Sequence, residues 1–241
     1  MPTQRVQFDE WLPDQPDNSG GLNDALNVIP VSIGYQPFPN SVDFSGAAAE
    51  NINSVFVAKW GTEVIIFAGG ATKLFKFNNT TEALEDKSKS GGYSSTFSWK
   101  FVQFGKTVIA VNGNAIIQYW TIGTSTAWAD IATSPIARQV AVVRDFVVTG
   151  YVNTGTLGNS TVQWSDINDE TDWTAGATSQ ADNQVIPDGG NIQAVTGGEF
   201  GLILLEKSIS RMSYVGSPLF FQFDNISRGL GCLNGNSVCQ L

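Results

Sequence analysis

The sequence has no histidine, two cysteines and few charged side chains. Without histidine, the Ser-His-Asp and Cys-His mechanisms, the His-Glu-x-x-His zinc sites and imidazole pH switches are all excluded. Charged residues make up 15% of the 241 residues, below the roughly 25% of an average domain. The chain has 13 Lys and Arg and 22 Asp and Glu, so its formal net charge is −9. A clamp on nucleic acid needs a positive face and is therefore not expected.

Long hydrophobic stretches are also lacking. The first 20 residues hold no apolar core of a secretion signal. The longest apolar runs, residues 64–68 and 202–205, are far shorter than the roughly 20 residues of a membrane-spanning helix. We therefore expect a soluble protein, made in a reducing cytoplasm, with no membrane partner. Cys232 and Cys239 could pair across a hairpin, although a buried thiol is the commoner fate of a cysteine.

Residues 1–46 differ from the rest because they hold six of the nine prolines. Proline blocks helix interiors and sheet ladders, so we expect an extended N-terminal arm that cannot build a sheet of its own. The spacing of Leu22, Leu26 and Ile29 allows one short helix, ending at Pro30. Apolar residues on such an arm must be buried against another surface. We favour another subunit, and the alternative is that the arm folds back on its own propeller. The residues expected to make these assembly contacts are Phe8, Trp11, Leu12, Tyr35 and Phe38.

From residue 47 onward one pattern recurs. An apolar strand, a tight turn, a second apolar strand, a Gly/Asn turn and an alternating third strand follow one another four times. The first turns lie near Gly61, Gly105, Asp145 and Glu199. The second strands are almost wholly apolar, which is typical of innermost strands buried on both faces.

This repeat predicts an all-β fold of the β-propeller type, with about four blades that need not close into a ring. A β-sandwich is the alternative; we favour the propeller because the order of strand types recurs as well as their number. Helix content should stay under about 10%, since no long window has a 3.6-residue period. The propeller domain spans residues 47–241, with blades at 47–93, 94–134, 135–190 and 191–228, and the first strand of a further blade at 229–241.

An acidic segment at residues 164–173 is the strongest candidate site. A calcium loop of the EF-hand type would need Gly and Glu where the chain has Thr171 and Ala177. We favour a structural turn, in which Asp and Asn accept backbone N–H groups; a loose cation site and catalysis are the alternatives. The candidate residues are Asp166, Asn168, Asp169, Glu170 and Asp172.

No residue is assigned to catalysis or to a cofactor, and no cofactor is expected. The Gly-Gly steps do not open a helix with Lys-Ser/Thr, so they form no phosphate loop. Four aromatic residues are expected to pack between blades, and a platform for carbohydrate stacking is the alternative role. These residues are Trp99, Phe101, Trp120 and Trp164.

Three motifs resemble those of virion proteins in short-tailed bacteriophages, known as tail hub, nozzle or stabilisation proteins. The N-terminal motif consists of Leu12-Pro13-Asp14, Asn27-Val28-Ile29-Pro30 and the turn Gly34 to Pro39. The segment WSDINDETDW resembles a second motif, with Glu170 where proline is usual, and FFQFDNISRGLGC resembles a third. Members of this family usually continue beyond this point, which puts closure of the propeller within this sequence in doubt.

The resemblance implies a non-enzymatic structural protein of the phage tail, located in the virion and made in the host cytoplasm. Such proteins form a homo-oligomeric ring, commonly sixfold, next to portal and adaptor proteins and tail spikes or fibres. The ring surrounds the channel through which genomic DNA leaves, and an acidic wall suits DNA that passes without specific binding. A receptor- or carbohydrate-binding propeller is the alternative function. A propeller glycosidase would need two carboxylates about 5 to 9.5 Å apart in a pocket.

Overall fold

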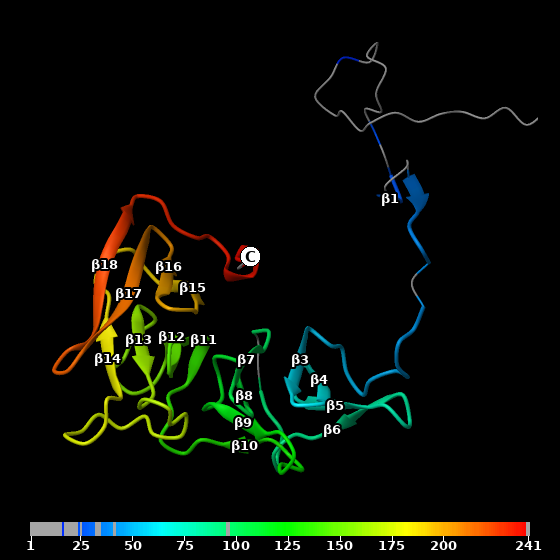
Figure 1. Ribbon diagram of the computed structural model, residues 1–241, viewed down its shortest axis with the longest axis horizontal. Coiled ribbons are helices and arrows are strands. Elements are labelled where there is room, and N and C mark those ends of the chain that lie inside the picture. The colour runs from blue at the N-terminus through cyan, green and yellow to red at the C-terminus, as the bar shows by residue number, and fades with distance from the viewer. Residues whose placement is uncertain are drawn as a thin grey trace, which may run out of the picture. The chain divides into compact units, whose positions relative to one another are not determined.

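The structure is a computed structural model that describes residues 16, 24, 26–31, 35–40, 42–94 and 97–239 (Figure 1). The chain divides into two compact units, Met1–Phe44 and Ser45–Leu241. Within the described residues the regular structure is almost wholly β, and its helical part is the 3-10 turn η1, Gly235–Ser237. The all-β prediction is therefore confirmed.

The first unit contains a small hairpin. Strand β1 (Val28–Pro30) pairs antiparallel with β2 (Tyr35–Pro37), and the backbone N–H of Phe38 donates to the carbonyl of Asn27 at 2.7 Å. The prediction that prolines keep the arm from building a sheet is wrong here. Both strands of a two-stranded sheet are edge strands, where proline is tolerated. The allowed helix is also wrong at Ile29, which lies in β1; Leu22 lies outside the described residues.

The second unit contains four antiparallel sheets of four strands each, numbered here in chain order. The first sheet consists of β3 (Ser54–Trp60), β4 (Glu63–Gly69), β5 (Leu74–Asn78) and β6 (Ala83–Asp86). The second consists of β7 (Lys100–Phe104), β8 (Thr107–Val111), β9 (Gln118–Thr121) and β10 (Ala129–Asp130). The third consists of β11 (Ala137–Val143), β12 (Phe146–Val152), β13 (Thr161–Trp164) and β14 (Asp182–Val185). The fourth consists of β15 (Ile192–Thr196), β16 (Gly201–Leu205), β17 (Ser208–Gly216) and β18 (Phe220–Arg228).

Within each sheet every strand pairs with its neighbour in the sequence, so the described sheets contain no Greek-key crossover. The first turns lie where the repeat predicts them. Gly61 and Gly105 adopt left-handed backbone angles, with φ of 59° and 57°, a conformation that costs glycine little. This order of strands agrees with the four predicted units and disagrees with the alternative of two face-packed sheets.

Consecutive sheets pack against each other through separate hydrophobic clusters. The cluster between the first and second sheets includes Phe67, Trp99 and Trp120. Ile109 and Val147 belong to the cluster between the second and third sheets. The cluster between the third and fourth sheets is made by Val143, Phe146, Val148, Val162, Trp164, Ile192, Ile203, Leu205, Met212 and Phe221, among others. The second and third sheets therefore each use one face for the sheet before and the other for the sheet after.

The C-terminal segment does not continue this pattern. Residues 229–239 contain no strand, so the predicted start of a further blade is wrong for the described part of 229–241. Instead the segment leaves β18 and reaches β7, the first strand of the second sheet, where the ammonium of Lys100 donates to the side-chain carbonyl of Asn236 at 2.7 Å. Cys232 is buried, its backbone N–H donates to the Leu205 carbonyl at 2.8 Å, and no disulfide joins it to Cys239.

Candidate functional site

The second strands of the four sheets are buried to different degrees. In the second sheet every residue of β8 is buried, and in the third sheet all of β12 except Tyr151 is buried. In the fourth sheet, by contrast, burial alternates along β16, so that Leu202 and Leu204 are only half-buried. All four strands have similarly apolar sequences, EVIIFAG, TVIAV, FVVTGYV and GLILL. The two terminal sheets thus carry apolar residues on a face that the described structure leaves only partly covered, although Ala68 and Phe75 on that face of the first sheet are buried.

On the first sheet we call this uncovered surface the leading face, the side away from the second sheet. Val55 and Val57 point from β3 to this side, opposite to Phe56, which stacks on Phe101 of the second sheet at 5.7 Å between ring centroids. Val55, Val57 and Val64 are 64%, 57% and 50% exposed. Exposed valines in neighbouring strands form an apolar patch, and such patches mark interaction surfaces.

The fourth sheet has a corresponding trailing face, the side away from the third sheet. Leu204 pairs with Ile209 across β16 and β17, and both are half-buried. Leu202 pairs with Arg211, which lies 3.6 Å from Asp224 on β18. The trailing face is therefore apolar across β16 and β17 and charged toward its edge at β18.

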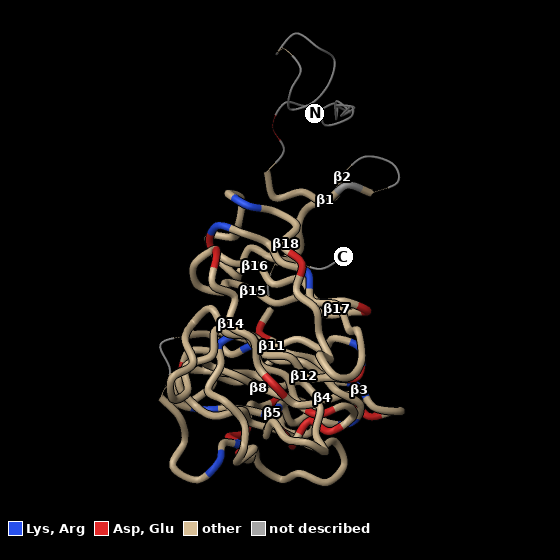
Figure 2. Tube along the Cα trace, turned by 90° about the vertical axis from the view of Figure 1, so that its left-hand side faces the viewer, with Lys and Arg blue, Asp and Glu red and all other residues tan. Residues whose placement is uncertain are grey.

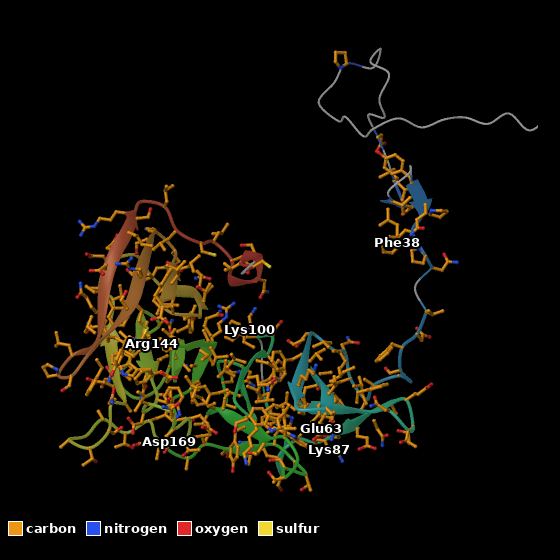
Figure 3. The ribbon with its side chains drawn as sticks, in the orientation of Figure 1. Phe38, Glu63, Lys87, Lys100, Arg144 and Asp169 are labelled. Carbon is orange, nitrogen blue, oxygen red and sulfur yellow. The ribbon has the colours of Figure 1, made fainter. Side chains whose placement is uncertain are left out.

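The hairpin of the first unit also exposes apolar side chains. Val28, Val31 and Phe38 are 36%, 42% and 60% exposed, and Tyr35 is half-buried (Figure 3). The other expected assembly residues, Phe8, Trp11 and Leu12, lie outside the described residues. Tyr35 and Phe38 therefore lie on a hairpin with an accessible apolar surface, and whether that surface contacts another subunit stays a prediction.

The acidic segment forms a tightly hydrogen-bonded loop after β13. A carboxylate oxygen of Asp166 accepts the backbone N–H groups of Ile167 at 2.8 Å and of Gln180 at 2.7 Å. Asp172 accepts the backbone N–H of Thr174 at 2.9 Å. These bonds connect the start of the loop with its end, and they are what a structural turn requires.

Asp169 has a similar role at the tip of this loop (Figure 3). Hydrogen bonds from the Thr171 hydroxyl, at 2.7 Å, and its backbone N–H, at 2.8 Å, hold the pKa of the Asp169 carboxyl below its usual range. Glu170 contributes its backbone carbonyl, which accepts the indole N–H of Trp173 at 2.9 Å, and Asn168 has a left-handed φ of 55°. Among the described residues no three Asp, Glu or Cys side chains are arranged around a metal position.

A polar cavity of about 500 Å³ lies beside β4, β5 and β6 and has Glu63 and Lys87 in its lining (Figure 3). Glu85 in this cavity accepts the amide N–H of Asn78 and lies 3.0 Å from the Lys87 ammonium. Hydrogen bonds from Asn78 and Lys87 lower the pKa of Glu85. Glu85 is therefore ionised at neutral pH and is poorly suited to donate the proton that glycoside hydrolysis requires.

A second cavity, of about 410 Å³, lies among β7, β11 and β15, the first strands of the second, third and fourth sheets, and the C-terminal segment. Lys100 lines it, and burial, with a smaller effect from Arg138, lowers the pKa of the Lys100 ammonium. Figure 3 shows Lys100 on the side of the body where the C-terminal segment ends. Acidic and basic positions are interspersed over the strands and loops of the body (Figure 2).

The aromatic residues singled out in the sequence lie between sheets. Trp99, Trp120 and Trp164 are each 2% exposed, and Phe101 is half-buried against Trp99. The indole N–H of Trp164 donates to the Gln180 carbonyl at 2.8 Å. The packing interpretation is confirmed, and three of the four rings have no open face for stacking a sugar.

Sequence reasoning missed the uncovered faces and both cavities. The second strands of all four sheets are similarly apolar in sequence. The sequence therefore does not show which of them have a neighbouring sheet on both faces and which on one. The cavity near Lys100 requires the C-terminal segment, which the sequence predicted to be a strand. Among the described residues, no helix has the length and hydrophobicity of a membrane span.

No protein-family model and no curated protein matches the sequence. One similar solved structure is the extracellular domain of a hybrid two-component system from B. thetaiotaomicron, with a TM-score of 0.53 and 12% identity. The match covers 78% of this chain and 23% of that domain, so this chain spans about a quarter of its length. BBS1N in complex with ARL6DN matches with a TM-score of 0.41 and 10% identity, over 79% of this chain and 56% of that one. At these identities the first likeness concerns the fold alone.

Proposed function

We propose that this protein is a non-enzymatic structural subunit of a bacteriophage tail, with a β-propeller-like body and an N-terminal assembly arm. Among the structural observations, the uncovered apolar faces of the first and fourth sheets support this proposal most directly. A surface with Val55 and Val57 more than half exposed favours a role inside an assembly. The tail itself is proposed from the resemblance of the three sequence motifs.

The propeller part of the proposal rests on the order of the sheets. Four antiparallel sheets with sequential strands pack one after another, and the second and third sheets use both faces for this packing. Such radial repetition is typical of propeller blades. The cavity beside Lys100 would then correspond to part of the central channel, because the first strands β7 and β11 border it.

The proposed partners are further copies in a ring, commonly sixfold, together with portal, adaptor and spike or fibre proteins. Genomic DNA would pass through this ring without specific binding. The net charge of −9 and the interspersed basic residues support this, because a phosphate-binding groove concentrates lysine and arginine. The proposed location is the virion.

The alternative, a receptor- or carbohydrate-binding module, has less support. It would need exposed aromatic rings near polar groups, and Trp99, Trp120 and Trp164 are buried. Catalysis by the acidic segment also has less support, because Asp166, Asp169 and Asp172 accept hydrogen bonds within their own loop.

Negative-stain electron microscopy of phage particles, with an antibody raised against this chain, tests the tail proposal. We expect antibody density at a ring on the tail axis. Particles that lack the chain would contradict the proposal, and binding of the isolated protein to a glycan array would favour the alternative. A variant lacking residues 1–40 tests the arm. We expect it to fold but not to enter particles, and normal incorporation would show that the arm is dispensable for assembly.

A further inference from the structure

The tripeptide Asn-Gly-Asn occurs twice in the second unit, at residues 112–114 and 234–236. An asparagine followed by glycine is prone to lose its side-chain amide spontaneously. The reason is that glycine has no side chain to hinder attack of its backbone nitrogen on the carbonyl carbon of the asparagine side chain. Because the two tripeptides have the same sequence, a difference in their reactivity comes from the fold around them.

The first tripeptide, directly after β8, is held in an unreactive arrangement. Asn112 and Gly113 are buried. The Gly113 N–H, which must lose its proton before the nitrogen can attack, donates to the Ala137 carbonyl at 2.9 Å. The side-chain carbonyl of Asn112 accepts the backbone N–H groups of Asn114 and Ala115 at 2.9 and 2.8 Å. Both reacting groups are therefore fixed by hydrogen bonds and shielded from water.

The second tripeptide lies in the C-terminal segment, where η1 begins. Asn234 and Asn236 are exposed, and Gly235 is half-buried. In the part of the chain that the structure describes, no acceptor binds the Gly235 N–H. The side-chain carbonyl of Asn234 accepts one backbone N–H, that of Asn236, at 3.0 Å. The attacking nitrogen is therefore not engaged in a hydrogen bond, and water reaches the asparagine.

We propose that Asn234 is a site of spontaneous deamidation and that the isoaspartate formed there releases the C-terminal segment from β7 and β15. The inference does not depend on the tail role. The Gly235 nitrogen gives its proton to solvent and bonds to Cγ of Asn234. The Cγ–Nδ2 bond breaks, and the amide nitrogen takes up a proton and leaves as ammonia. Water then opens the imide ring at either carbonyl and gives aspartate or isoaspartate, so one water is consumed, one ammonia is released and nothing is oxidised.

The close packing around Gly235 is the reason why isoaspartate would release the segment. In isoaspartate the main chain runs through the side-chain methylene, so the backbone becomes one carbon longer just before Gly235. A methyl group on Gly235 would overlap the Gln193 carbonyl oxygen and lie 3.2 Å from the side-chain nitrogen of Gln139. Because there is no room for extra atoms here, the lengthened backbone must move away, and the 2.7 Å hydrogen bond from Lys100 to Asn236 is lost with it.

Little apolar burial opposes this release. Leu230 and Leu233 are 72% and 94% exposed. Within residues 229–239, which the structure describes, Cys232 is the one buried residue. Segments with few buried apolar contacts open at a lower free energy than the core. The Cys232 thiol is therefore a reporter of opening.

Peptide mapping by mass spectrometry tests the site on the full chain. Trypsin cuts after Lys and Arg, so peptides 107–138 and 229–241 hold one Asn-Gly step each, and fragmentation locates the modified residue. During incubation at mildly alkaline pH we expect Asn234 to convert at least about ten times faster than Asn112, which reacts only after local opening. In concentrated urea, which removes the fold, the two should convert at similar rates. Similar rates in the folded chain would overturn the proposal.

Thiol labelling tests the release. In a Cys239→Ser background Cys232 is the remaining thiol, and a maleimide reaches it when the segment opens. We expect labelling to be several-fold faster after the incubation than before it. Asn234→Gln is the matched control and should show no change, because a glutamine side chain closes the larger imide ring far more slowly.

Two results would contradict the release. One is unchanged labelling in chains that peptide mapping shows to contain isoaspartate, because the segment would then stay in place. The other is loss of the cooperative urea transition in the incubated protein, because the thiol would then be exposed by unfolding of the whole body.

Discussion

The third and fourth sheets approach each other closely at Gly197, and substituting this residue with alanine tests their packing. The backbone N–H of Gly198 donates to the Val142 carbonyl at 2.9 Å, and the Arg144 N–H donates to the Gly198 carbonyl at 2.8 Å. A methyl group on Gly197 would overlap the Val142 carbonyl oxygen and lie 3.0 and 3.1 Å from the Val142 carbonyl carbon and nitrogen. A backbone carbonyl cannot turn away without breaking its hydrogen bond to Gly198.

The cost of this substitution follows from these contacts. Loss of two backbone hydrogen bonds costs about 1 kcal/mol each, and overpacking adds about 1–3 kcal/mol. We expect Gly197→Ala to lower the free energy of unfolding by about 3 kcal/mol or more. For a chain of this size that corresponds to a fall in Tm of about 6–12 °C, at about 2–4 °C per kcal/mol.

Urea and thermal unfolding followed by circular dichroism measure this effect. Gly158→Ala is the control, because Gly158 is exposed and a methyl group there meets nothing within 4 Å. The control should unfold within about 0.5 kcal/mol of the wild type or be slightly more stable. If Gly197→Ala behaves like Gly158→Ala, the third and fourth sheets do not approach each other as described.

The acidic loop gives three further predictions. Asp166→Ala should lower the free energy of unfolding by about 2 kcal/mol, because it removes a charged acceptor from two backbone N–H groups. Asp166→Asn should lower it less, and urea unfolding followed by circular dichroism measures both variants. The folded pKa of Asp169 lies below its unfolded value. Its contribution is therefore present above about pH 4 and lost as pH falls through the folded pKa. The stability difference between wild type and Asp169→Asn, under about 1 kcal/mol for so exposed a group, should shrink as the pH is lowered below about 4, and a pH-independent difference would contradict this sign. Finally, we expect no hydrolysis of glycan substrates in a reducing-sugar assay; activity abolished by Asp166→Asn would overturn the non-enzymatic proposal.

The sequence predicted the four sheets well because each depends on local signals. Strands that are neighbours in the sequence pair with each other, and two local signals fix this pairing. One is a turn residue such as Gly61 or Gly105, and the other is the alternation of apolar and polar residues along each third strand. The buried indoles were predictable for a similar reason, since large aromatic residues in apolar strands gain most from packing between sheets.

The remaining features depend on contacts that no local pattern encodes. The C-terminal segment has glycines and asparagines compatible with a strand end, yet it forms η1 because Asn234 caps that turn and Lys100 binds Asn236. The hairpin at Val28 to Pro37 was missed because the prolines were read as blocking any sheet, although edge strands accept them. Asp166 was predicted to be a turn residue. Its hydrogen bond from the backbone N–H of Gln180 was not predictable, because it forms only when the end of the loop folds back beside its start.

The C-terminal segment also has a consequence for the order of folding. Each four-stranded sheet can form from neighbours in the sequence, so little chain entropy opposes it. The bond between Lys100 and Asn236 instead spans 136 residues, and a contact of that separation forms only after the intervening sheets have brought its ends together. The inner cavity beside Lys100 is therefore completed last. The cavity forms only when the second, third and fourth sheets have all reached their final positions.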